Sequence, residues 1–466
     1  MKKDGINSQA FFNIMSQIVL NGTNFVLVMV FTRFLSTENY GIVSIYQAYL
    51  LFIAAIVGLN VQGTIGPAFV HIDEKEQDSY LYSILLLALG SLLVILVIVI
   101  LFIKQISNFT QLSPILIFLM VFHGYGVFCF NFISIKYVYL KKSQNTFVIS
   151  FLLSIMMIVF SFLGMNVLEN LIPDYYGRII GLALPYIICS IFSTLSIFKR
   201  GIPSTKKIEY WKFCIPICLP LMLHGISQIV LSQTDKIMIQ KLLSDASIVG
   251  IYSFIVTFVH VLNSTYTALN NTWVPIYYDY IKNNDNLTLC SRAKKYNNFF
   301  TYLVFGFILL APEVVKIFAD NSYWKGIYLI PLVALATYFV FLYSFAVNYE
   351  IYHKKTKLIA IGTTASAVCN ILLNLLLIPK YKATGAAVAT LLSYLLLFVF
   401  HEICARKISD NEYMFTPKFY YTNIFKILVI VCIFYLFIDF AIIRWVLAVL
   451  IGFKILYELK LNKSLF

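Results

Sequence analysis

A small set of ionisable side chains lies inside or at the edge of long apolar segments, where charged groups are expensive and therefore usually functional. The ones that could do chemistry are Arg33, Asp235, Lys236, His224 and His260. Positive charges there could compensate an anionic ligand, and the carboxylate of Asp235 could exchange a proton or a sodium ion. Each has a structural alternative: Asp235 and Lys236 can form a local ion pair, Arg33 can anchor at the interface, and the histidines can serve in packing.

Neutral amides accompany these charges in the first, second, seventh and eighth apolar segments. Those singled out as binding candidates are Asn60, Gln62, Gln228 and Asn270. No C-x-x-C pair occurs among the 8 cysteines, and no phosphate-binding G-x-x-x-x-G-K-[ST] loop occurs. The sequence therefore predicts no metal site, no bound cofactor, no catalytic residue and no enzymatic activity.

The elements that carry these residues are predicted to be membrane-spanning helices. Of the 466 residues 60% are apolar and only 12% are charged, against about 25% in soluble domains. About 280 apolar residues, at about 20 for each span, suffice for about fourteen helices. This composition excludes a soluble enzyme, a disordered chain and a secreted disulfide scaffold. The predicted fold class is an all-α polytopic membrane protein.

Fourteen apolar segments can be delimited by charges and turn residues. They are 11–32, 40–66, 80–103, 112–135, 145–168, 177–198, 213–234, 247–272, 297–318, 326–348, 358–378, 383–404, 420–438 and 441–457. If the N-terminus is inside, 25 of the 35 Lys and Arg residues fall inside and 10 outside. This asymmetry predicts that both termini are cytoplasmic. It also accounts for the net charge of +14 without a nucleic-acid partner.

Three short motifs recur at one spacing. V-Y-L-K-K-S at 138–143 matches I-Y-H-K-K-T at 351–356, and L-I-P-D-Y-Y-G at 171–177 matches L-I-P-K-Y at 377–381. Leu35-Ser36 with Gly41-Ile42 matches Leu243-Ser244 with Gly250-Ile251. A period of about 208 residues covers six spans, which predicts parallel repeats. We expect six-helix lobes at 1–208 and 209–406, two further helices at 407–466, and a central cleft that works by alternating access.

Several of these stretches resemble one family. Residues 232–252 (SQTDKIMIQKLLSDASIVGIY), 34–42 (FLSTENYGI), 269–276 (LNNTWVPI) and 311–318 (APEVVKIF) resemble the polysaccharide repeat-unit flippases of the O-antigen and capsule type. Those proteins belong to the multidrug/oligosaccharidyl-lipid/polysaccharide exporter superfamily. Gln240 departs from the family's usual glycine.

The resemblance implies a function in surface polysaccharide biosynthesis. It implies a flippase of the bacterial cytoplasmic membrane that moves undecaprenyl-pyrophosphate-linked oligosaccharides, with a polymerase and a chain-length regulator as candidate partners. The amides would bind sugar hydroxyls, and the cations would bind the pyrophosphate. A multidrug/cation antiporter of the same superfamily, a polytopic polysaccharide polymerase or glycosyltransferase, and a membrane scaffold are the alternatives. The two extra spans and the 34–42 motif argue against the antiporter, and the lack of a long outer loop argues against the polymerase.

Overall fold

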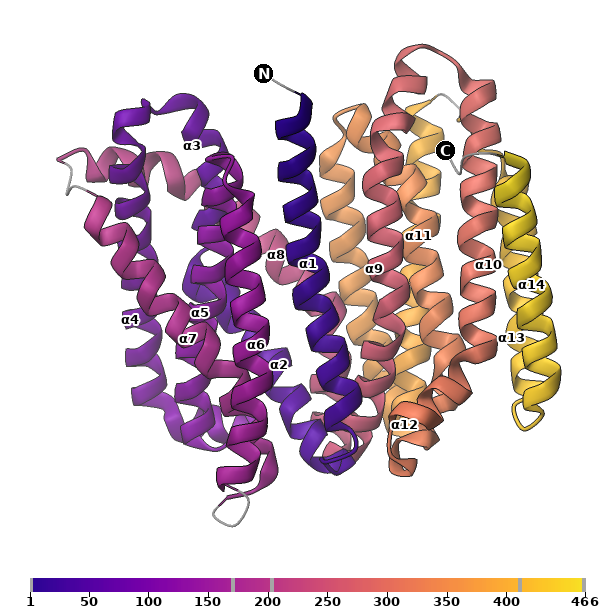
Figure 1. Ribbon diagram of the computed structural model, residues 1–466, viewed down its shortest axis with the longest axis horizontal. Helices are drawn as coiled ribbons and strands as arrows, with labels where there is room; N and C mark the ends of the chain where they lie inside the picture. The colour runs from indigo at the N-terminus through magenta and orange to yellow at the C-terminus, as the bar shows by residue number, and fades with distance from the viewer. Residues whose placement is uncertain (1–2, 169–171, 202–204, 410–412, 463–466) are drawn as a thin grey trace. The chain divides into compact units, whose positions relative to one another are not determined.

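Helices account for the regular secondary structure of the computed structural model, which describes residues 3–168, 172–201, 205–409 and 413–462 (Figure 1). In chain order they are α1 (Lys3–Phe31), α2 (Thr37–Gly58), η1 (Val61–Thr64), α3 (Ile65–His71), η2 (Glu74–Glu76), α4 (Gln77–Thr110), α5 (Pro114–Tyr139), α6 (Ser143–Leu168), α7 (Asp174–Arg200), α8 (Lys207–Leu243), α9 (Ala246–Lys282), α10 (Asn286–Phe318), η3 (Asn321–Leu329), α11 (Ile330–Tyr352), α12 (Thr356–Ile408), α13 (Pro417–Leu436) and α14 (Ala441–Asn462). The two N-terminal and four C-terminal residues, which we predict to be cytoplasmic, and Leu171 of the repeat motif lie outside this description.

Twelve of the described helical segments are long and apolar enough to cross a membrane. The fold class predicted from composition, an all-α polytopic membrane protein, is confirmed. Two of the predicted spans, 358–378 and 383–404, lie in the single element α12, which is broken at Lys382 (φ 51°, ψ −130°). The last predicted span is α14, which is not among the twelve and carries Arg444, Lys454 and Glu458.

The predicted second span, 40–66, is not one helix. α2 ends at Gly58, and Leu59 and Asn60 both adopt left-handed backbone conformations (φ 47° and 52°) before η1 begins. A left-handed residue cannot continue an α-helix, so it ends the helix at that point. The prediction read 40–66 as one span because apolar residues continue beyond the polar stretch at 60–64.

The chain divides into two compact units, and the first comprises residues up to Phe31 and Glu38–Thr234. Within it α6 and α7 pack closely through small residues: a Cβ atom on Gly177 would lie 2.6 Å from the Gly164 backbone. Gly177 and Gly181 form the small-x-x-x-small spacing that lets membrane helices approach each other. Arg178 between them is buried, with its guanidinium 2.6 Å from Ser161 Oγ.

The second unit comprises Thr32–Thr37 and the chain from Asp235 onward. An aromatic core joins α9, α10 and α11; Phe300 and Phe341, for example, have ring centroids 4.3 Å apart. α13 and α14 pack against α10, as Figure 1 shows. Arg444 of α14 is buried, makes a bidentate ion pair with Glu313 of α10 and donates to the Leu309 carbonyl at 2.8 Å. The six-helix lobes expected at 1–208 and 209–406 remain a prediction.

Candidate functional site

The buried carboxylate of Asp235 is the centre of a polar cluster inside the second unit. Its side chain is only 4% exposed. Tyr252 Oη of α9 donates to Oδ2 at 2.6 Å, Asn374 Nδ2 of α12 donates to Oδ1 at 2.6 Å, and Thr390 Oγ1, beyond the break in α12, donates to Oδ2. Three neutral donors from two helices therefore surround one ionisable acid.

A second layer of amides supports the donors around Asp235. Asn374 Nδ2 also lies 3.0 Å from Asn370 Oδ1, and Asn370 Nδ2 lies 3.4 Å from Thr390 Oγ1. Asn374 Oδ1 is buried and has no hydrogen-bond partner among the described residues. Carboxylate, amide and hydroxyl oxygens are the ligands that hard cations prefer. Lys236 lies within electrostatic range of Asp235. Because a bare buried charge is costly in a low-dielectric interior, the carboxylate is favoured to pair with that lysine, to take up a proton or to bind a cation.

Of the predicted cationic residues, Arg33 has a structural partner. It lies in the turn after α1, and its Nε donates to the carbonyl of Phe318 at 3.1 Å, while Nη2 donates to that of Ile317. These carbonyls end α10, where a helix has no partners of its own and where a positive charge is favourable. Arg33 thus caps α10 in this structure, in line with the alternative of an interfacial anchor.

The remaining candidates of the second unit lie on α8 and α9. Lys236 follows Asp235 and is half-buried. It lies within electrostatic range of His260, whose exposed ring is 3.5 Å from both Asn263 Nδ2 and Ser264 Oγ. Asn270 Oδ1 accepts a hydrogen bond from Asn348 Nδ2 at 3.3 Å. Of these side chains, Lys236 also lies within electrostatic range of Asp235.

In the first unit, the break after α2 places two predicted residues side by side. Gln62 Nε2 donates to Asn60 Oδ1 at 2.7 Å, and Gln62 Oε1 is buried without a partner among the described residues. A Cβ atom on Gly63 would lie 3.0 Å from Leu221 of α8. His224 and Gln228 lie three and seven residues further along α8, which places them on the same face as Leu221. Both side chains are exposed.

One buried pair of ionisable residues was not among the sequence candidates. Glu350 of α11 and His401 of α12 are both fully buried, with Oε1 and Nδ1 2.9 Å apart. Glu350 Oε2 and His401 Nε2 have no hydrogen-bond partner among the described residues. The sequence did carry a signal, since His401 lies within the apolar run 383–404, where an ionisable residue is a functional candidate.

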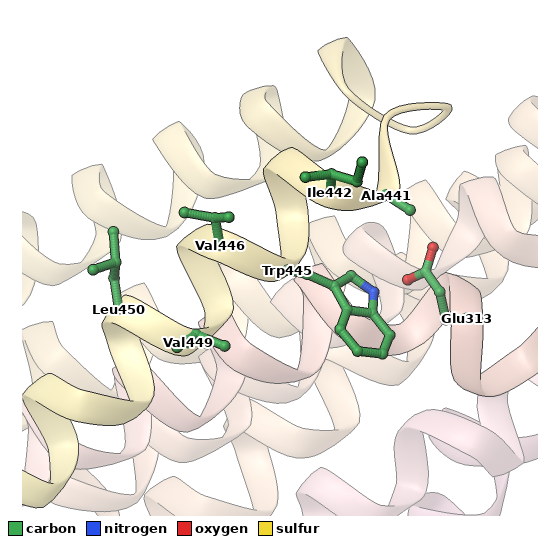
Figure 2. Close-up of a pocket in the computed structure, with 7 residues that line it drawn as sticks. All are labelled: Glu313, Ala441, Ile442, Trp445, Val446, Val449 and Leu450. Carbon is green, nitrogen blue, oxygen red and sulfur yellow. The ribbon is translucent and has the colours of Figure 1, made fainter.

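A surface pocket of about 450 Å³ lies apart from these polar residues (Figure 2). It is a groove along α14, open to the outside and almost entirely apolar. The residues that line it are Glu313, Ala441, Ile442, Trp445, Val446, Val449 and Leu450. None of these was a sequence candidate for binding.

Comparisons with known proteins place the chain in a family. The family described as "Polysaccharide biosynthesis protein" matches residues 7–280. The Lsg locus putative protein 1 of Haemophilus influenzae is 23% identical over 364 residues, which are 74% of this chain and 84% of that protein.

Two solved structures share the fold. The lipid II flippase MurJ in an inward closed conformation has a TM-score of 0.70 at 17% identity, over 96% of this chain and 97% of that one. An inward-facing multidrug resistance MATE family transporter of the MOP superfamily has a TM-score of 0.55 at 14% identity, over 87% of this chain and 96% of that one. This chain therefore belongs to the polysaccharide biosynthesis protein family and has the fold of MOP-superfamily flippases and transporters.

Proposed function

We propose that this protein is a flippase that moves undecaprenyl-pyrophosphate-linked oligosaccharide repeat units across the bacterial cytoplasmic membrane by alternating access, for surface polysaccharide biosynthesis. The observation that carries the proposal is the match of more than half the chain to the polysaccharide biosynthesis family. The shared fold with a lipid II flippase supports it, since that protein's name also denotes a lipid-linked cargo. A polymerase and a chain-length regulator of the same polysaccharide are the proposed partners.

The polar residues of the helices have the chemistry that such a cargo requires. We assign sugar binding to the amides and histidines of the two units and pyrophosphate binding to the cations. The residues are Arg33, Asn60, Gln62, His224, Gln228, Lys236, His260 and Asn270. Amides offer paired donors and acceptors that match sugar hydroxyls. Lys and Arg compensate the phosphate charges, which would otherwise be costly to carry across a hydrocarbon layer about 30 Å thick.

Asp235 is the proposed coupling residue. Its three neutral donors leave the carboxylate free to exchange a proton or a sodium ion, which would reset the carrier after each release. The multidrug/cation antiporter is the second candidate function, favoured by the likeness to the MATE fold. The two differ in cargo, so an assay of the lipid-linked oligosaccharide separates them.

The experiment is complementation in cells that lack their own repeat-unit flippase. The unmodified chain should restore surface polysaccharide and prevent the lipid-linked precursor from accumulating in the inner leaflet. Asp235→Asn should abolish both effects at normal protein level, whereas Asp279→Asn, an exposed acid of α9, should have none. Reconstituted vesicles then test the ion, because transport should depend either on sodium or on a proton gradient. If the purified chain moves no lipid-linked oligosaccharide but exports cationic drugs, the antiporter is the correct function.

The cations have their own test. Arg33→Ala and Lys236→Ala should each lower export without lowering protein level, and Arg33→Lys should be milder because charge is retained while the bidentate fork is lost. Arg33 also caps α10, so thermal stability must be measured beside export. If both alanine variants export normally at normal abundance, the two residues serve only as structural anchors.

A further inference from the structure

Two lysines from separate helices converge on one tyrosine of the second unit, and a third lysine lies nearby. Lys454 Nζ of α14 lies 4.7 Å from the Tyr302 ring centroid, and Lys426 Nζ of α13 lies 6.0 Å from the same ring. Lys294 of α10 and Lys454 are both within electrostatic range of Lys426. We call Lys294, Lys426 and Lys454 the lysine cluster. None of them has a place in the transport residues proposed above.

The lysine cluster is short of negative charge. Glu458 is within electrostatic range of both Lys426 and Lys454, so these two lysines share one acid. The other partner described for Lys426 is neutral: Nζ donates to Asn423 Oδ1 at 3.0 Å, and Asn423 Nδ2 donates to Asn298 Oδ1 at 2.9 Å. Lys426 is therefore held in place by amides and lies beside positive charge, which is the arrangement of an anion site.

The surroundings of the lysine cluster are those of a lipid-facing surface. Ile442, Val446 and Leu450 of α14 are 80%, 54% and 59% exposed. They precede Lys454 at intervals of four residues, so all four side chains follow one stripe of the helix. The first three line the apolar groove (Figure 2). The groove thus leads along α14 towards the lysine cluster.

Distances along α14 set the depth of the lysine cluster. Lys454 lies 13 residues after Ala441, which is about 20 Å at 1.5 Å per residue. The hydrocarbon layer is about 30 Å thick. If the α13–α14 turn lies at one face of the membrane, Lys454 lies about 10 Å from the opposite face. Its long side chain can extend towards the headgroups there. A lysine at that level faces lipid phosphate rather than bulk water.

We propose that the lysine cluster, with Tyr302, binds the phosphate of an anionic phospholipid in the leaflet opposite the α13–α14 turn, with one acyl chain in the groove along α14. Basic pockets between membrane helices are suited to anionic headgroups, since each lysine near the surface favours them. An acyl chain fits the groove because its lining is apolar apart from Glu313, which is already paired with Arg444. The proposal holds whatever cargo the protein carries.

Trp445 makes the site measurable because it lines the groove. The full chain is reconstituted in vesicles of phosphatidylcholine and phosphatidylglycerol, with brominated acyl chains on one lipid at a time, and tryptophan quenching reports which lipid occupies the groove. Subtracting the signal of Trp445→Phe isolates this tryptophan. We expect preference for phosphatidylglycerol, and a loss of about fivefold in relative affinity for each lysine removed in Lys426→Gln and Lys454→Gln.

Controls keep the proposal falsifiable. Lys426→Arg with Lys454→Arg should retain the preference, and Lys357→Gln, which removes a lysine at the start of α12, should leave it unchanged. If the variant that combines Lys426→Gln with Lys454→Gln does not fold, Lys454→Gln alone must still lower the preference for phosphatidylglycerol. An unchanged preference in the lysine variants overturns the proposal. The proposal is also overturned if free inorganic phosphate, added at constant ionic strength, removes the preference for phosphatidylglycerol. The lysine cluster would then bind soluble phosphate.

Discussion

The buried pair of Glu350 and His401 gives a sharp prediction about stability. Both side chains are 0% exposed, and their contact is 2.9 Å. Removing one partner leaves the other buried without its hydrogen-bond partner, which costs about 1–3 kcal/mol. The backbone of α12 packs closely against the imidazole, since a Cβ atom on Gly362 would lie 2.9 Å from His401 Nε2. There is therefore little room for a water molecule to replace the lost hydrogen bond of the histidine. We therefore expect His401→Leu and Glu350→Leu each to destabilise the protein by about that amount.

The double variant is the decisive measurement. Replacing both partners of a buried hydrogen bond with apolar residues can be nearly neutral or stabilising. Glu350→Leu with His401→Leu should therefore be more stable than the sum of the two single changes predicts, with a coupling energy of about 2 kcal/mol or more. The assay is reversible unfolding of the purified protein in mixed micelles with increasing SDS. If the double variant loses as much as the two single variants added together, the pair is not energetically coupled and the reasoning is wrong.

The export assay on the same variants then separates structure from function. A stable double variant that no longer exports would assign the pair a role in the transport cycle. A stable double variant that exports normally would assign it to folding alone.

Three further predictions concern packing and topology. Arg444→Ala should lower the unfolding free energy by about 3–5 kcal/mol, because Glu313 and the α10 carbonyl lose their partner; Arg444→Lys should recover only part of it in the same SDS titration. Gly177→Leu should prevent α6 and α7 from packing, since even a Cβ atom would lie 2.6 Å from the Gly164 backbone; protease sensitivity of the purified protein checks this, and an unchanged digestion pattern would contradict it. Single cysteines should be labelled from inside the cell at position 206 and from outside at position 381, and the reverse pattern would refute the predicted orientation.

Much of the fold could be predicted from the sequence because each membrane-spanning helix corresponds to a continuous apolar segment. Their composition determined the fold class, and the helix boundaries follow charges and turn residues. The break at Leu59 and Asn60 was not predicted, because the apolar residues on either side were read as one span and neither residue is a glycine. The turn at Lys382 lies between the predicted spans 358–378 and 383–404, and so its position was predicted. Its tightness was not: a Cβ atom on Gly385 would lie 2.4 Å from the Leu377 carbonyl oxygen.

The candidate site could be predicted only in part. Asp235 was recognisable, since a carboxylate in an apolar segment is rare. Its partners Asn374 and Thr390 lie 139 and 155 residues away in the chain, and nothing in one sequence pairs residues so far apart. Arg444 illustrates the same difficulty. It lies inside the last predicted span, 441–457, as the structure confirms, but nothing in the sequence pairs it with Glu313 of α10.

The ion pair between Glu313 and Arg444 also has a consequence for biogenesis. α14 follows α10 in the chain and carries an arginine, a residue whose insertion into a membrane is unfavourable. Its partner Glu313 is synthesised 131 residues earlier. The insertion of α14 is therefore completed by pairing with Glu313 rather than by the hydrophobicity of α14 itself. A chain whose α10 has misfolded would leave Arg444 without a counter-charge.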